Sequence, residues 1–132
     1  MSGEHDLATL LRNLNAVLQP DTYVFVSRPG QGTPPDLVPR MVFHESEGTT
    51  FIVLRDEAEA LGWSYEFPCR MITLHIHSAL DAVGFLARIT TALAKGGMGV
   101  NPVSGFYHDH LFVPEDRADD AMAILAKLAA ES

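Results

Sequence analysis

Apolar residues recur at helical spacing near the start of the chain. This pattern predicts an amphipathic helix over residues 7–18, which Pro20 ends. The apolar positions are Leu7, Leu10, Leu11, Leu14, Val17 and Leu18.

Short apolar runs separated by turn residues follow this first segment, and they predict a strand-rich region. Residues 28–39 hold four prolines and two glycines, so we expect a loop there. Loops of this length are often functional, and this one could close over a pocket. The other expected elements are a strand at 23–26, a hairpin of strands 41–44 and 50–54, a helix from Asp56 to Leu61 and a strand at 63–67.

The second half of the chain has clearer periodicity. Residues 71–77 alternate, with Ile72, Leu74 and Ile76 on one face, as in a half-buried strand. A helix with its cap at Asp81 and its end at Gly96 is expected next. The pattern then predicts strands at 98–103 and 108–113, a turn at 105–107 and a helix that Pro114 opens.

A weak internal repeat relates the two halves. Residues 51–58 (FIVLRDEA) are similar to residues 111–118 (LFVPEDRA), and each reads as a strand that turns into an acidic helix start. We therefore expect a duplication, with a first half over residues 1–69 and a second over 70–132. The first half lacks a helix between its first two strands, and the amino-terminal helix is expected to fill that space.

Composition narrows the class of protein. The 132 residues are 47% hydrophobic and carry a net charge of −8, which is typical of a globular domain and unsuited to binding nucleic acid. The single cysteine, Cys69, excludes an internal disulfide and a thiolate zinc site. Neither a secretory signal nor an apolar run of about 20 residues is present, so we expect a cytoplasmic protein with no membrane partner.

Several segments of the second half carry a family resemblance. Residues 80–89 (LDAVGFLARI) resemble the ACT-domain signature, and residues 100–104 match the second strand of that family. The segments 82–84 (AVG) and 107–114 (YHDHLFVP) are similar to a family of small, uncharacterised bacterial proteins with two ACT-like halves. The resemblance implies an α+β, ferredoxin-like fold of βαββαβ units, with antiparallel sheets, helices on one side and a tandem duplication.

The turn before the second-half helix is the first candidate site. Gly84 is expected in the first helical turn, where free backbone N–H groups favour a carboxylate, and Asp81 could hold an ammonium group opposite them. A purely structural role, with Asp81 as cap and Gly84 as packing residue, remains the alternative. The resemblance implies an amino-acid ligand bound by Asp81, Ala82, Val83, Gly84, Asn101, Pro102, Val103 and Ser104.

Histidines form the second candidate site. The expected pairing of strands 71–77 and 108–113 places His77 near His108 and His75 near His110. Four imidazoles on one open face could bind Zn²⁺, Ni²⁺ or Cu²⁺, form a pH-sensitive interface, or be an ordinary polar face.

No residue pattern supports an enzyme. Ser104 lacks a clear orienting acid and a nucleophile elbow, and Gly30-Gln31-Gly32 is not followed by a helix. We therefore expect a regulatory module without a cofactor that binds a small molecule, forms a homodimer and acts through a partner. The alternatives are a metal-binding protein or metal-dependent enzyme using the histidine face, and an interaction module without a ligand.

Overall fold

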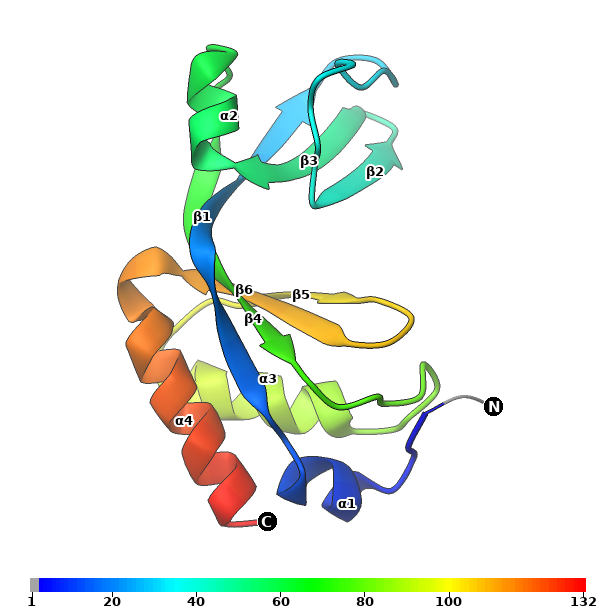
Figure 1. Ribbon diagram of the computed structural model, residues 1–132, viewed down its shortest axis with the longest axis vertical. Coiled ribbons are helices and arrows are strands. Elements are labelled where there is room, and N and C mark those ends of the chain that lie inside the picture. The colour runs from blue at the N-terminus through cyan, green and yellow to red at the C-terminus, as the bar shows by residue number, and fades with distance from the viewer. Residues whose placement is uncertain (1–2) are drawn as a thin grey trace. The chain divides into compact units, whose positions relative to one another are not determined.

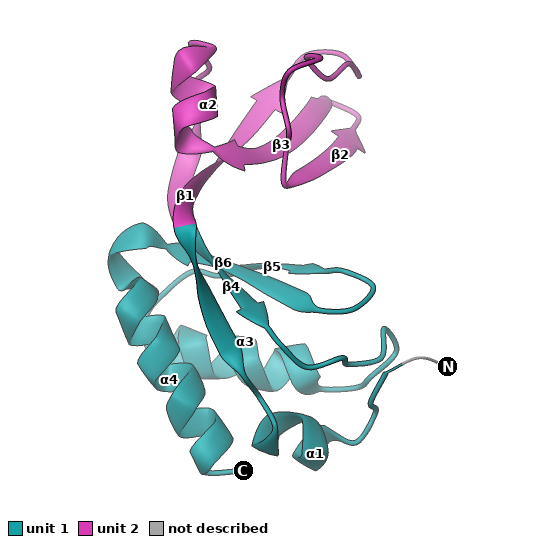
Figure 2. Cartoon of the chain, viewed as in Figure 1, with its two compact units in different colours: residues 1–20, 70–132 teal, residues 21–69 magenta. Residues whose placement is uncertain are grey.

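The computed structural model describes residues 3–132, which form two compact units (Figures 1 and 2). Unit 1 comprises residues 1–20 and 70–132, and unit 2 comprises residues 21–69. The elements are α1 (Leu7–Arg12), β1 (Ala16–Arg28), β2 (Met41–Glu45), β3 (Gly48–Leu54), α2 (Arg55–Ala60), β4 (Glu66–Leu74), α3 (Phe85–Lys95), β5 (Asn101–Ser104), β6 (Asp109–Pro114), the 3₁₀ turn Glu115–Arg117 and α4 (Ala118–Ala130).

Unit 1 has the strand order β1-β4-β6-β5, with helices on one face (Figure 1). Alternation in β4 and β6 turns Ile72, Leu74, Leu111 and Val113 to the same side, where they are buried. Helices α3 and α4 cover this side with the buried residues Phe85, Ile89, Leu93, Ala121 and Leu125. The order β4-α3-β5-β6-α4 is the expected βαββα run, and β1 supplies the remaining strand.

Unit 2 has the strand order β2-β3-β1, with β1 and β4 shared between the two units along the chain. The register pairs Val24 with Val53 and Val26 with Phe51, so these four apolar residues share a face. They are buried with Ala58 of α2. Residues 29–40 contain no helix, as the prolines predict.

The start of the chain differs from the sequence-based expectation. The helix expected over 7–18 ends at Arg12, and Val17, Leu18 and Pro20 lie in β1. Leu10 and Leu11 are buried among residues of α3 and α4 in unit 1, so α1 does not fill the place of the missing helix in the first half. The predicted division after residue 69 separates the two sequence repeats. The compact units differ from it, because unit 2 (residues 21–69) is inserted between the two segments of unit 1.

Other element ends also shift. Helix α2 begins at Arg55 with Leu54 as its cap, so Asp56 is not the cap. Strand β4 runs through Pro68 and ends at Leu74, which leaves His75 and His77 outside it. Helix α3 begins four residues after Asp81. Among the described residues, no helix has the length and apolar character needed to cross a membrane.

Candidate functional site

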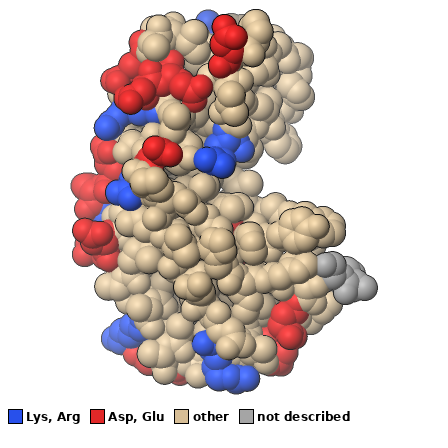
Figure 3. All heavy atoms as spheres, in the orientation of Figure 1, with Lys and Arg blue, Asp and Glu red and all other residues tan. Residues whose placement is uncertain are grey.

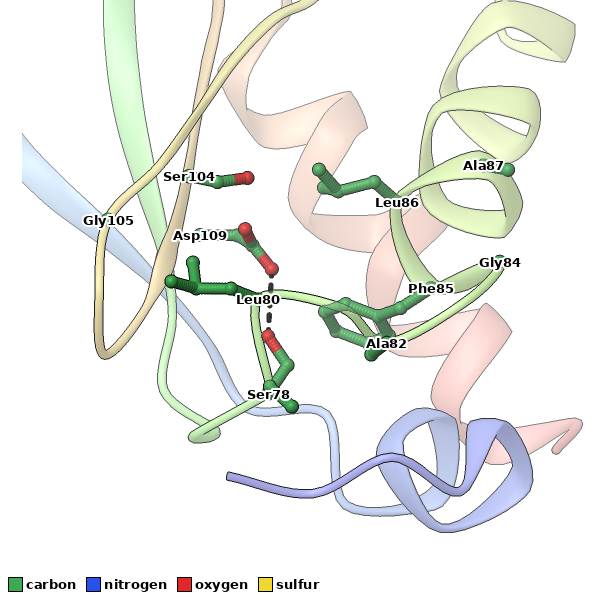
Figure 4. A pocket seen from close by; sticks show the side chains of 11 residues that line it. Ser78, Leu80, Ala82, Gly84, Phe85, Leu86, Ala87, Ser104, Gly105 and Asp109 are labelled. Carbon is green, nitrogen blue, oxygen red and sulfur yellow. Dashed lines mark hydrogen bonds between the residues drawn. The ribbon is translucent and has the colours of Figure 1, made fainter. Parts of the chain in front are cut away.

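A pocket of about 130 Å³ lies in unit 1 where four segments meet (Figure 4). The β4–α3 connection supplies Ser78, Ala79, Leu80 and Ala82, and the start of α3 supplies Gly84, Phe85, Leu86 and Ala87. The end of β5 and the start of β6 supply Ser104, Gly105 and Asp109.

The backbone on the α3 side of the pocket has the features that favour an anionic group. Gly84 caps α3 in a left-handed conformation with φ of +89°, which a glycine adopts without strain. The first intrahelical bond runs from Arg88 N to Gly84 O at 3.0 Å. The N–H groups of the first helical residues therefore have no partner within the helix, and they carry the positive end of the helix dipole. No acidic side chain occupies this first turn.

The opposite wall carries a negative charge. Asp109 is only 7% exposed, and its Oδ2 accepts a hydrogen bond of 3.1 Å from Ser78 Oγ. Figure 4 shows the Asp109 side chain between Ser78 and Ser104, across the pocket from the start of α3. A carboxylate in a partly desolvated site favours an ammonium group. The pocket thus offers one wall for a cation and one for an anion.

The N-terminal segment of unit 1 holds the β4–α3 connection in place. Glu4 N donates to His77 O at 2.8 Å, and Ala79 N donates to Glu4 O at 2.9 Å. Gly3 packs so closely that a Cβ there would lie 2.7 Å from Ala79 N. These contacts fix the backbone that carries Ser78.

Three of the eight predicted ligand residues line this pocket: Ala82, Gly84 and Ser104. Asp81 instead lies 2.8 Å from His5 Nε2, and its side chain is 57% exposed. Val83 is exposed. Asn101, Pro102 and Val103 belong to the earlier part of β5 and are not among the lining residues.

Ser78 and Asp109 line the pocket but are not among the ligand residues predicted from the sequence. A signal existed for Asp109, since alternation along 108–113 puts it on the same face as the apolar Leu111 and Val113. An acidic residue on a core-facing position is unusual and points to a function.

The histidines pair differently from the prediction. His75 faces His108 with ring centroids 5.0 Å apart, and His110 Nδ1 lies 3.1 Å from Thr73 Oγ1. His77 contacts the ring of Tyr107 at 5.2 Å. The observed contacts are offset by two residues from the predicted pairing, and His75 and His77 lie beyond the end of β4.

The described part of the chain contains no group of three or more His, Cys, Asp or Glu side chains placed to hold a metal ion. The predicted convergence of four imidazoles on a single ion is therefore not seen. Within residues 3–132, the buried Nδ1 atom of His108 has no hydrogen-bond partner.

Comparison with known proteins identifies the fold family. Models of the ACT domain match residues 2–70 and 66–127. The chain belongs to the ACT-domain family. It contains two such domains in tandem, and each match spans one of the two related segments.

Solved structures support this assignment. A protein of unknown function from Vibrio cholerae, described as a possible transport protein, is 34% identical, with a TM-score of 0.83 over 93% of this chain and 95% of that one. A protein from Agrobacterium tumefaciens is 16% identical, with a TM-score of 0.75 over 88% and 89% of the two chains. The ligand-free regulatory subunit of aspartate kinase from Thermus thermophilus shares the fold, at 12% identity and a TM-score of 0.66 over 86% and 95%. No curated protein matches the chain.

The family defines the general role of this ACT protein. Tandem ACT domains with an antiparallel sheet are regulatory modules that bind small molecules.

Proposed function

We propose that this ACT protein binds a free amino acid in the pocket at the start of α3, and that binding regulates a partner without turnover of the ligand. The observation that carries the proposal is the pairing of a buried carboxylate, Asp109, with the free N–H groups of α3 across one pocket. An amino acid is a zwitterion, so its ammonium group suits Asp109 and its carboxylate suits the N–H groups at the start of α3.

The volume of the pocket limits the size of the amino acid that it can hold. A cavity of about 150 Å³ holds one benzene molecule, so about 130 Å³ has room for a ligand of about six non-hydrogen atoms. Glycine, alanine and serine are of this size. The side walls formed by Ala79, Ala82 and Leu86 leave little space for a long or charged side chain.

We also propose a homodimer in the cytoplasm. Strand β2 is at the edge of its sheet, with Val42 and Phe43 exposed, and an uncovered apolar edge favours pairing with a second copy. Cys69 is the single cysteine of the sequence and is buried, so no internal disulfide can form, which suits a reducing compartment. Light scattering on the purified chain tests the dimer.

A thermal-shift panel of the twenty amino acids, repeated with a chelator, tests the ligand proposal. Binding at 100 times the dissociation constant stabilises a protein by about 2.7 kcal/mol, so a ligand is readily detected. We expect small amino acids to raise the melting temperature and the chelator to leave it unchanged. No rise in melting temperature with any amino acid would contradict the proposal and favour a ligand-free interaction module. A lower melting temperature in the presence of the chelator would favour the metal-binding alternative.

A further inference from the structure

One helix, α2, covers the sheet of unit 2, whereas both α3 and α4 cover the sheet of unit 1. In unit 1, α3 and α4 pack side by side on the sheet. In unit 2, α2 packs on β3 and buries Ala58, while residues 29–40 run as a loop between β1 and β2. The rest of this core is covered by the loop and by the partly buried Trp63 and Tyr65.

The loop covers this core with a single apolar side chain. Its prolines exclude a helix, because each removes a backbone N–H and blocks the preceding turn. Leu37 N donates to Pro34 O at 3.1 Å, and this turn directs Leu37 into the core of unit 2, where it is 9% exposed. A loop turn fills less volume than a helix.

A cavity of about 230 Å³ remains between this loop and α2. Its walls are largely apolar, with Leu37 on the loop side and Ala60 and Leu61 on the helix side. Leu61 is 45% exposed, which is high for a leucine beside a core. The volume is about one and a half times that of a benzene-sized cavity, so it has room for about nine non-hydrogen atoms.

Two carboxylates belong to the same cavity. Asp36 and Glu57 line it, and within residues 3–132 neither takes part in an ion pair. Glu57 receives long hydrogen bonds of 3.4 and 3.5 Å from the backbone N–H groups of Leu54 and Val38. Unit 2 carries eight acidic and three basic residues, and Figure 3 shows acidic side chains gathered over α2. An apolar cavity in such a field attracts a cation.

We propose that this cavity is a second binding site, for a protonated amine that carries a compact apolar group. The apolar group lies against Leu37, Ala60 and Leu61, and the ammonium group lies between Asp36 and Glu57. A free amino acid does not suit this site, because its carboxylate would face two carboxylates. The proposal is independent of the amino-acid pocket in unit 1.

Titration of the full chain with three matched probes tests the proposal. The probes are 2-phenylethylamine, neutral 2-phenylethanol and anionic 3-phenylpropionate, followed by backbone NMR. We expect the amine to shift the resonances of Leu37, Ala60 and Leu61 in a saturable way, and to bind more weakly as salt is raised. Equal binding of all three probes, or binding elsewhere on the chain, would overturn the proposal.

Variants separate the charge from the cavity. Asp36→Asn is expected to weaken amine binding about two- to fivefold, as for the loss of one partly exposed ion pair. Asp56→Asn removes a carboxylate of α2 that is outside the lining, so it is the control for charge alone and should have less effect. Ala60→Phe fills the cavity from an exposed helix position and should abolish binding while the protein stays folded. An unchanged affinity in Asp36→Asn and Ala60→Phe would refute the site.

Discussion

Ser78 and Asp109 meet at a hydrogen bond of 3.1 Å although they are 31 positions apart in the chain. The bond joins the β4–α3 connection to the start of β6 and orients a buried carboxylate at the wall of a pocket. One of the two oxygens of Asp109 accepts this bond, and the carboxylate charge remains available to a ligand. The proposed amino-acid site depends on this orientation of Asp109.

Asp109→Asn should weaken amino-acid binding. The amide keeps an oxygen that can accept the Ser78 hydroxyl but loses the negative charge that pairs with an ammonium group. We expect at least about a tenfold rise in dissociation constant, since charged hydrogen bonds contribute about 1.5–3 kcal/mol. Calorimetric titration with the amino acid identified by the panel measures the change.

Asp81→Asn is the matched control for this variant. Asp81 is the carboxylate that the sequence pattern favours, but it lies outside the lining and faces His5. We expect affinity to be nearly unchanged. Loss of binding in Asp81→Asn with retention in Asp109→Asn would reverse the assignment.

Gly84→Ala should destabilise the protein by about 1–2 kcal/mol, because alanine at a left-handed φ is strained. Space is not the cause, since the nearest atom to an added Cβ is Leu7 Cδ2 at an ordinary 3.5 Å. Urea unfolding measures the loss. Gly99→Ala, which meets nothing within 4 Å and has no positive φ, should be nearly neutral. Equal losses in the two variants would contradict the conformational explanation.

The cap of α1 predicts a pH dependence. The pKa of Asp6 is lowered because the Thr9 hydroxyl and the Thr9 N–H both donate to its carboxylate, at 2.6 and 2.9 Å. A lowered folded-state pKa stabilises the fold above the unfolded value of 3.8, and this contribution is lost as pH falls through the lower folded value.

Asp6→Asn isolates this effect, because asparagine caps a helix about as well but does not titrate. Urea unfolding between pH 6 and about pH 2 should show a steeper loss for the unchanged protein than for the variant. Parallel curves would indicate that the carboxylate contributes no pH-dependent stability.

The periodic elements of this chain could be predicted from its sequence. The regular spacing of Ile89 and Leu93, and the hairpin around Gly48, correspond to α3 and to β2–β3. The helix predicted through residues 14–18 is wrong there, because their apolar spacing suits a helix and a strand alike and the pairing of β1 in the sheet favours the strand. Local pattern gives an element's type more surely than its ends.

The candidate site was predicted less completely for a physical reason. Gly84 and Ser104, which line the pocket, are in the segments whose resemblance to the ACT domain implies a ligand. The partner carboxylate, Asp109, comes from a strand that reaches the pocket only through tertiary packing. The predicted pairing of the histidines was wrong for the same reason, because the register between two strands is set by tertiary packing.

His108→Phe should stabilise the protein, by about 1 kcal/mol. Nδ1 of His108 is buried without a partner among the described residues, and an unsatisfied buried polar atom costs about 1–3 kcal/mol. Phenylalanine keeps a ring at the contact with His75, 5.0 Å away, and removes the polar atom. Urea unfolding at neutral pH measures the difference.

His110→Phe is the comparison that makes this result specific. His110 lies two residues further along, in β6, but its Nδ1 is hydrogen-bonded to Thr73 Oγ1, so the same substitution removes a bond and should destabilise by about 1 kcal/mol. Opposite signs for the two variants would show that the unpaired nitrogen, and not the size of the ring, decides the change. A loss in both would mean that His108 Nδ1 gains a partner in solution, and would return the His75–His108 pair to consideration as a ligand-binding feature.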